Sequence, residues 1–384
     1  MSWMTASQAL RTLGVRPQTL YANVSRKRIR AKADPKDPRR SLYHEADVWR
    51  LARKRSGARK SEEVAAAAIE WGDAVLASAV STVAGGRLWY RGEDAVVLAE
   101  SKTLEEVAAL LWEVQAPQRL AIKRAAPAAA ARRPSGELSR AFLELARRVS
   151  EDPPAHGRTL AVLQGEAAEV LATLADAMLG SGGGSALHQR LAKSWGRAEA
   201  GDLVRRALVL LADHELNAST FATRVTVSTG ASLAAGVLSG LATLTGPLHG
   251  GAAAGVRELM EAAASQGADS AVRDRLAQAR PMAGFGHPLY PAGDPRAAAL
   301  LRVLGVPPAL AQVRDVVEEL VGERPNIDFA LAVMTQTCRL PRQAPLVLFA
   351  LARSVGWLAH ALEQVTTGRL IRPRARYVGP APRL

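Results

Sequence analysis

Apolar residues recur at helical spacing in nearly every segment of this chain from position 103 onward. Leu104, Val107, Ala108 and Leu111, for example, fall on one face of a helix. Ala, Leu and Val dominate the apolar residues, and only 4% of the chain is aromatic. Because Ala and Leu are strong helix formers and poor strand formers, closely packed helices are favoured over sheets. We therefore predict a mainly α fold, in which the C-terminal part of the chain is all-α after a short hairpin.

The hairpin is expected at residues 80–90, where Gly85 and Gly86 supply the positive φ angles of a tight turn. Further on, the 32 residues between Arg224 and Arg257 carry no charge and have the length of a membrane span. They are rich in Ser, Thr and Gly and contain a proline, which fits a buried helix that runs into a loop. We expect no membrane association.

Positive charge is concentrated at the N-terminus. Residues 1–60 contain 16 Lys and Arg against four Asp and Glu, a net charge of +12, whereas the whole chain carries +14. The rest of the chain is therefore close to neutral. This asymmetry predicts an appended module with an anionic partner.

The N-terminal module has the pattern of a helix-turn-helix domain. Thr5 and Gln8 form a capping box at the start of one helix, and Pro17 suits the first turn of a second. A turn-rich basic loop at residues 34–40 precedes a short extended run at residues 41–43 and a third helix at about residues 45–54. This order resembles the winged DNA-binding domains of the MerR and excisionase type.

That resemblance implies a DNA-binding domain at residues 1–56, and the charged residues 57–64 are expected to be a linker. The single cysteine, Cys338, excludes an internal disulfide and favours a reducing compartment. The N-terminus has no basic region followed by an apolar run, so we expect no signal peptide and a cytoplasmic protein. No Cys/His cluster has the spacing of metal ligands, so we expect no metal.

Seven polar residues in the C-terminal half lie in short motifs that are candidate functional sites. They are His214 in Ala-Asp-His-Glu-Leu-Asn, His249 in Gly-Pro-Leu-His-Gly-Gly, His287 in Gly-Phe-Gly-His-Pro-Leu-Tyr, Arg296 in Gly-Asp-Pro-Arg-Ala, Asp328 in Pro-Asn-Ile-Asp-Phe, Arg353 in Ala-Arg-Ser-Val-Gly-Trp and Arg372 in Arg-Pro-Arg-Ala-Arg-Tyr.

Several of these residues have a simpler explanation when each is taken alone. His214 is expected to lie on an apolar helix, after Leu208-Val-Leu-Leu, and could be a buried core histidine. Asp328 could equally cap a helix, and Arg296 and Arg372 could be solvated surface charges. The two histidines flanked by glycines are the exception, because sharply turning backbone presents side chains to a cleft.

In this order, the seven residues resemble the citrate synthase family, and the resemblance covers roughly residues 65–384. It implies a large helical domain made of residues 65–264 and 353–384, and a smaller one at residues 265–352 that closes over the substrates. It also implies a homodimer, in which Arg372 is donated across the interface. The substrates would be oxaloacetate and a short acyl-CoA, with no further cofactor.

The resemblance implies a role for each residue. Condensing an acyl-CoA with a keto dicarboxylate requires a carboxylate base, donors to two developing oxyanions, and arginines that bind carboxylates at two points. Asp328 is expected to take the acyl proton, His249 to bind the thioester oxygen and His287 to donate to the keto oxygen. The residues expected to bind the keto acid are His214, Arg296, Arg353 and Arg372. A helix is expected to begin just after His249, and its N-terminus would favour a neutral imidazole.

The chain departs from the family pattern at four positions near these motifs. The family often has a histidine at the position of Leu211 and polar residues at those of Ala253 and Ala254, and an arginine or lysine commonly stands at that of Pro288. The seven residues are intact, but the sequence does not choose between acetyl-CoA and propionyl-CoA.

Two other interpretations of the whole chain remain open. The basic N-terminal module favours a DNA-binding regulator whose synthase-like body senses a CoA ester or a keto acid. Alternatively, the module is a packing or dimerisation element of an enzyme. The intact set of seven residues favours catalysis by citrate or 2-methylcitrate synthesis.

Overall fold

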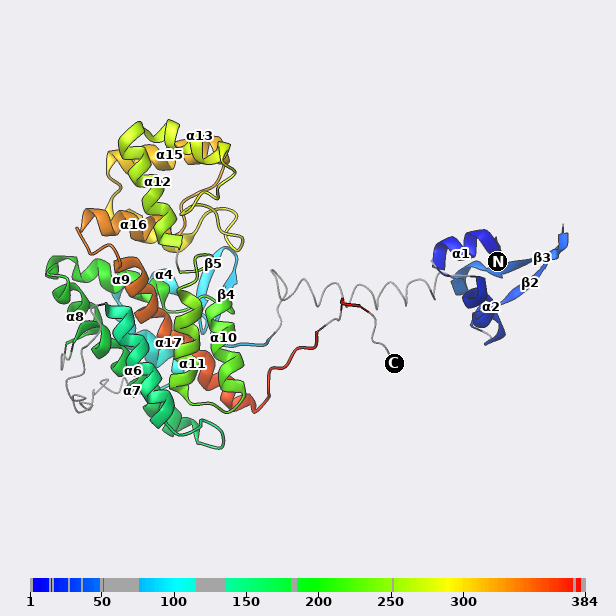
Figure 1. Cartoon of the computed structure of the whole chain (residues 1–384), viewed down its shortest axis with the longest axis horizontal. Coiled ribbons are helices and arrows are strands. Elements are labelled where there is room, and N and C mark those ends of the chain that lie inside the picture. Colours follow the sequence, from blue (N-terminus) through cyan, green and yellow to red (C-terminus); the bar gives the residue numbers. More distant parts are fainter. Residues whose placement is uncertain are drawn as a thin grey trace. The chain divides into compact units, whose positions relative to one another are not determined.

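The computed structural model divides into two compact units, Met1–Ala77 and Ser78–Leu384 (Figure 1). The positions that the structure describes are 3–13, 15, 17–26, 28–35, 37–48, 51, 76–114, 136–180, 185–250, 252–375 and 378–380. The predicted linker at residues 57–64 lies outside them.

The N-terminal unit contains two short helices and a three-stranded antiparallel sheet in the order β1-β3-β2. Its named elements are β1 (Trp3–Thr5), α1 (Ala6–Leu13), α2 (Pro17–Ser25), β2 (Ala31–Asp34) and β3 (Asp37–His44). The predicted capping box is confirmed, since the Thr5 amide donates to Gln8 Oε1 at 2.8 Å and the Gln8 amide to Thr5 Oγ1 at 3.4 Å. The unit has its own apolar core, which includes Ala9, Leu20 and Tyr43.

The prediction of a basic loop at residues 34–40 is wrong, because most of this segment belongs to the hairpin of β2 and β3. Strand β3 pairs with β2 at Asp37 and at Ser41–Tyr43, whereas β1 pairs only with its last residues, Leu42–His44. The antiparallel pairing with β2, together with the burial of Tyr43, outweighs the weak strand preference of a segment rich in Asp, Pro and Lys. Residues 45–48, in the region of the predicted third helix, are helical.

The C-terminal unit opens with the predicted hairpin. Strands β4 (Ser81–Ala84) and β5 (Arg87–Tyr90) pair antiparallel, and the short β6 (Glu93–Asp94) joins them. Gly85 and Gly86 make the turn with φ angles of 59° and 70°. The predicted hairpin is therefore confirmed.

The rest of this unit is helical, as the apolar periodicity predicted. Its α-helices are α4 (Ala95–Ser101), α5 (Leu104–Trp112), α6 (Glu137–Glu151), α7 (Leu160–Leu179), α8 (Leu187–Ser194), α9 (Gly201–Leu211), α10 (Ala218–Ser228), α11 (Leu233–Leu244), α12 (Ala252–Gln266), α13 (Ala268–Ala277), α14 (Pro295–Leu304), α15 (Pro308–Val321), α16 (Ile327–Thr337) and α17 (Ala344–Thr367).

Helix α17 runs through the middle of the largest core and contacts α5, α7, α9, α10 and α11. Of the helices in the described part of the chain, it alone has the length and mean hydropathy, 1.4, of a membrane span. However, 94% of its most apolar window is buried inside the protein, as in the core helix of a soluble protein. The uncharged stretch between Arg224 and Arg257 is divided among α10, α11 and α12.

A second, smaller core lies among α12, α13, α15 and one face of α16, and these helices group together in Figure 1. Helix α16 connects the two cores: Ile327 packs in the large core and Phe329 in the small one. Asp328 therefore lies where the two cores meet. The division into domains at 264/265 and 352/353 stays a prediction, although the second core already includes Val256.

Candidate active site

His214 is buried, but it lies in the loop between α9 and α10 and not on the helix as predicted, because α9 ends at Leu211. Its Nε2 is 2.9 Å from the hydroxyl of Tyr290, and its ring meets that of His287 edge-on with centroids 5.0 Å apart. Burial, assisted by the positive charges of Arg296 and Arg353, lowers the pKa of His214 well below its usual range. His214 is thus a buried histidine that also faces other candidate residues, so the two interpretations of the sequence are compatible.

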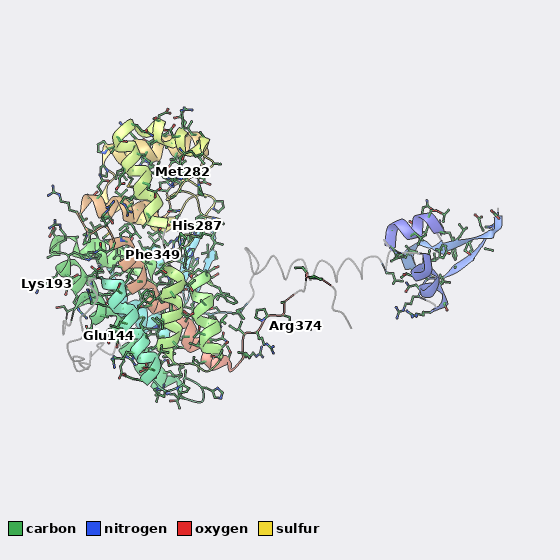
Figure 2. All side chains as sticks on the ribbon, viewed as in Figure 1. Glu144, Lys193, Met282, His287, Phe349 and Arg374 are labelled. Carbon is green, nitrogen blue, oxygen red and sulfur yellow. The ribbon has the colours of Figure 1, made fainter. Side chains whose placement is uncertain are left out.

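His287 lies in the loop before α14, and its tautomer follows from one hydrogen bond. The backbone amide of Leu289 donates to Nδ1 at 3.2 Å, so Nδ1 carries no proton. Burial, helped by Arg296, lowers the pKa of His287 to about 4. The ring is therefore neutral at pH 7 and holds its proton on Nε2, which is a hydrogen-bond donor. Figure 2 shows His287 between the helices of the small core and Phe349 on α17.

His249 occupies a tight turn between α11 and α12, and α12 begins three residues later, as predicted. Its Nε2 lies 2.9 Å from Ser219 Oγ. Burial lowers the pKa of His249 to about 4, with a smaller contribution from Arg353. Among the described residues, no side-chain partner is found for its Nδ1.

Ser219 lies in a crowded set of hydrogen bonds. Its hydroxyl accepts from Trp357 Nε1 at 3.1 Å and lies 2.7 Å from Asn217 Oδ1 and 2.9 Å from His249 Nε2. A hydroxyl has one proton, so Ser219 can donate either to Asn217 or to His249. The choice decides which nitrogen of the neutral His249 ring carries the proton.

The two buried arginines of this site, Arg296 and Arg353, differ in how many of their N–H groups are hydrogen-bonded within the protein. Arg296, on α14, makes a bidentate ion pair with Asp294, with Nε 3.0 Å from Oδ1 and Nη2 2.8 Å from Oδ2. Arg353, on α17, donates only from Nε, to the carbonyl of Leu211 at 2.9 Å. Its two terminal nitrogens donate to no residue in the described part of the chain, so this fork can bind an anion in two places.

Asp328 is the second residue of α16 and is partly buried. The helix is capped by Asn326, whose Oδ1 accepts the Asp328 amide at 3.0 Å, so the carboxylate of Asp328 is not the cap. Burial raises the pKa of Asp328 to about 6, with Arg296 acting in the opposite direction and Asp294 adding to the rise. A carboxylate with this pKa is a suitable general base near neutral pH.

Electrostatic interactions link six of the seven predicted residues into one cluster. The charges of Arg296 and Arg353 and the rings of His249 and His287 all act on His214, and Arg296 also acts on Asp328. Arg372 is the exception: it is exposed and lies in the segment after α17. No hydrogen bond or ion pair between it and the other six is found within the described ranges.

Several residues that contact members of this cluster were not predicted from the sequence. Tyr290 and Ser219 contact two of the histidines directly, and Asp294 pairs with Arg296. Tyr290 and Asp294 stand in the quoted motifs, which was the only available signal for them. His360, which lies on α17 as Arg353 does, has its Nε2 3.3 Å from the buried Asp213. No group of three or more potential metal ligands occurs among the residues that the structure describes.

Comparisons with known proteins show the family of the chain. Residues 69–374 match the family model described as the C-terminal domain of citrate synthase. The chain is 39% identical over 186 residues to citrate synthase 2 of Bacillus subtilis, an alignment that covers 46% of this chain and 50% of that relative. The chain thus spans about half the length of the curated relatives it matches.

Solved structures give the same result over a longer span. Citrate synthase from Thermotoga maritima superposes with a TM-score of 0.68 at 29% identity, covering 82% of this chain and 96% of that one. A Thermoplasma acidophilum citrate synthase, solved as a ternary complex with carboxymethyl coenzyme A and oxaloacetate, superposes with a TM-score of 0.67 at 24% identity, covering 81% and 95%. With a family model that covers most of its length and with this fold, the chain belongs to the citrate synthase family.

Proposed function

We propose that this protein condenses a short acyl-CoA with oxaloacetate and releases CoA. The observation that carries the proposal is the cluster itself: a carboxylate with a raised pKa in one site with neutral imidazoles and an arginine whose fork is unoccupied. A base, oxyanion donors and a carboxylate binder are the parts that this reaction needs.

In the proposed mechanism, Asp328 takes a proton from the carbon next to the thioester. The enolate oxygen accepts a hydrogen bond from His249, and the carbon attacks the keto carbon of oxaloacetate. The Nε2 proton of His287 stabilises the oxygen of that keto group as it gains negative charge and becomes a hydroxyl. Water then attacks the thioester carbonyl of this adduct, the carbon–sulfur bond breaks, and CoA leaves as the thiol while a new carboxylate forms. If His249 donates from Nδ1, Ser219 must give its proton to Nε2 instead of to Asn217.

The keto acid is proposed to bind through its two carboxylates and its keto oxygen. Arg353 offers two terminal nitrogens, and Arg296 keeps Nη1 beyond its pair with Asp294. His214 lies beside both guanidinium groups. The Thermoplasma acidophilum relative, whose complex contains oxaloacetate and a CoA analogue, supports both substrate classes.

The test is thiol release by the purified protein from acetyl-CoA and from propionyl-CoA, each with and without oxaloacetate. Release that requires oxaloacetate supports the proposal, and the ratio of the two rates gives the acyl preference. No release from either thioester would overturn it and would favour a regulator that only senses these ligands.

We further propose that the unit is a homodimer in which Arg372 completes the site of the partner subunit. Its exposure on an extended segment supports this role. Mixed dimers of Asp328→Asn and Arg372→Ala chains contain one site with both residues intact. Activity regained on mixing would support donation across the interface, and none regained would contradict it.

A second proposed function, DNA binding, concerns the N-terminal unit. This unit has a separate core, and its sheet carries a basic hairpin that includes Lys32 and Arg39. A net charge of +12 over residues 1–60 supports contact with phosphates, by a domain of the winged helix-turn-helix kind. Mobility shifts of duplex DNA with the full-length protein should show binding that weakens steeply with salt. No binding at low salt would overturn this role.

A further inference from the structure

The small β4–β5 sheet is joined by hydrogen bonds to the loop that carries His214. From β5, the buried Tyr90 hydroxyl lies 3.1 Å from the carbonyls of Val209 and Asp213 and 3.3 Å from that of Leu210, and it accepts from the Asp213 amide at 3.2 Å. These carbonyls lie at and just beyond the C-terminal end of α9, where carbonyl groups lack the regular partner four residues further along the helix; the carbonyl of Val209 also accepts from the Ala212 amide at 3.2 Å. One strand of the sheet therefore fixes the end of the helix.

The other strand, β4, holds the residues on both sides of His214. The hydroxyl of Ser81 donates to the Asp213 carboxylate and accepts from the Glu215 amide at 3.0 Å. The Glu215 carboxylate accepts from the Val83 amide and from Thr82 Oγ1, the latter at 3.2 Å. His214 is thus placed between two carboxylates that are both bound to the same strand.

The backbone at Glu215 is in the left-handed region, with φ of 50°. A residue with a β-carbon adopts this conformation only at an energetic cost, so surrounding contacts must maintain it. The contacts present are the hydrogen bonds of Glu215 to Ser81, Val83 and Thr82. This turn leads the chain from His214 into α10, whose N-cap is Asn217.

We propose that Ser81 and Glu215 are positioning residues for the keto acid: by binding β4 to the loop, they hold His214 at the place where it meets Arg296, Arg353 and His287. The inference rests on the proposed function. It explains why a mainly helical unit retains a short sheet at this point. Neither residue needs to touch the substrate, and both act through the backbone next to His214.

The central test compares Glu215→Ala with Glu215→Gln. Glu215→Ala removes the contacts to β4 and should raise the KM for oxaloacetate about tenfold, while kcat changes less than about threefold. Glu215→Gln keeps an amide oxygen that accepts from Val83 and Thr82, so it should restore most of the affinity. Ser81→Ala should resemble Glu215→Ala. Glu93→Ala, an exposed residue on β6, is the matched control for loss of one negative charge and should leave KM unchanged.

Glu215→Gly separates positioning from relief of strain. Glycine adopts a positive φ without cost, so this variant should unfold at a higher temperature than Glu215→Ala. Its affinity for oxaloacetate should nevertheless be at least as weak, because the anchor to β4 is gone. A glycine variant that binds oxaloacetate as well as the unchanged protein would overturn the inference.

Oxaloacetate binding is measured by calorimetry as well as by turnover, so that two failures can be told apart. If the unchanged protein neither binds oxaloacetate nor releases thiol, the proposed function fails. If it does both, and Glu215→Ala and Ser81→Ala match it in dissociation constant and KM, the positioning role fails while the function stands.

Discussion

Two of the three loops that bring histidines to the site, those with His214 and His249, are held in very different ways. The α9–α10 loop with His214 is hydrogen-bonded to β4, β5 and α17. From α17, Arg353 Nε donates to the carbonyl of Leu211, and the Gly356 amide donates to the carbonyl of Ala212. The α11–α12 loop with His249 is held mainly by its own turn and by Ser219. The side chain of Leu248, next to His249, is fully exposed at 101%.

This difference indicates a division of labour within the proposed site. Groups that are fixed before binding lose little entropy when a ligand arrives, so the His214 side is prepared for a small, rigid dianion. On the His249 side, the side chain of Leu248 is exposed, and we propose that the bound acyl-CoA covers it. The predictions below separate the two sides, beginning with the largest expected effect.

Asp328→Asn should lower the rate of thiol release without changing the affinity for the keto acid. Asparagine keeps the size and polarity of the side chain but cannot accept the proton, so thiol release should fall by about 10³-fold or more. The dissociation constant for oxaloacetate should stay within about twofold. Asp315→Asn, the same change on the exposed face of α15, is the control and should leave both unchanged. Near-normal thiol release from Asp328→Asn would remove this residue from the mechanism.

Arg353→Lys should affect the opposite side of the site. Lysine keeps the charge and loses the planar fork, and one charge-assisted hydrogen bond contributes about 2 kcal/mol. The KM for oxaloacetate should therefore rise about thirtyfold, with a smaller change in the KM for acyl-CoA. Arg342→Lys, on an exposed arginine ahead of α17, is the matched control. If the two substrates lost affinity equally, the proposed division of the site would be wrong.

Sequence patterns over a few residues predicted the helices and the β4–β5 hairpin better than they predicted the contacts between these elements. The apolar periodicity predicted the helices, and Gly85-Gly86 predicted the hairpin, because these signals act over a few residues. The motifs identified six residues that the fold brings together from distant elements. Tyr290 and Ser219 were missed because a hydroxyl partner is chosen by tertiary packing, which leaves no spacing signal. The β2–β3 hairpin was missed because antiparallel pairing of the two strands outweighed the composition of the segment.

The pH dependence should also differ between the two sides. Because burial raises the pKa of Asp328 to about 6, kcat/KM should rise with pH to a plateau above 6 and fall about tenfold per pH unit below it. His249 and His287, with pKa values near 4, are neutral throughout this range and add no second inflection. Oxaloacetate binding should stay nearly flat from pH 6 to 8. A plateau that extends down to pH 5 would contradict the role of Asp328.

The same groups set opposite trends in stability. Folding raises the pKa of Asp328 above its value of 3.8, so its penalty to the folded state, present above pH 6, is relieved as pH falls from 6 toward 4. Folding lowers the pKa of His214, His249 and His287 below 6.5, so the unfolded state binds protons first and stabilisation of the folded state is lost as pH falls from 6.5 toward 4. With three histidines against one carboxylate, the free energy of unfolding should fall across this window. Urea unfolding at several pH values measures it.

Deleting residues 1–60 should have the smallest effect on either side of the site. The core of the N-terminal unit is made from residues 4 to 51, whereas the large core of the other unit begins at Val80, so the deletion opens neither core of the remaining chain. Thiol release and both KM values should stay within about twofold, while duplex DNA binding, measured by mobility shift, should be lost with the net charge of +12. If the shortened protein formed an inactive aggregate, the N-terminal unit would instead have a packing role. Such a result could arise at β4, because this strand begins at Ser81, shortly after the boundary between the two units.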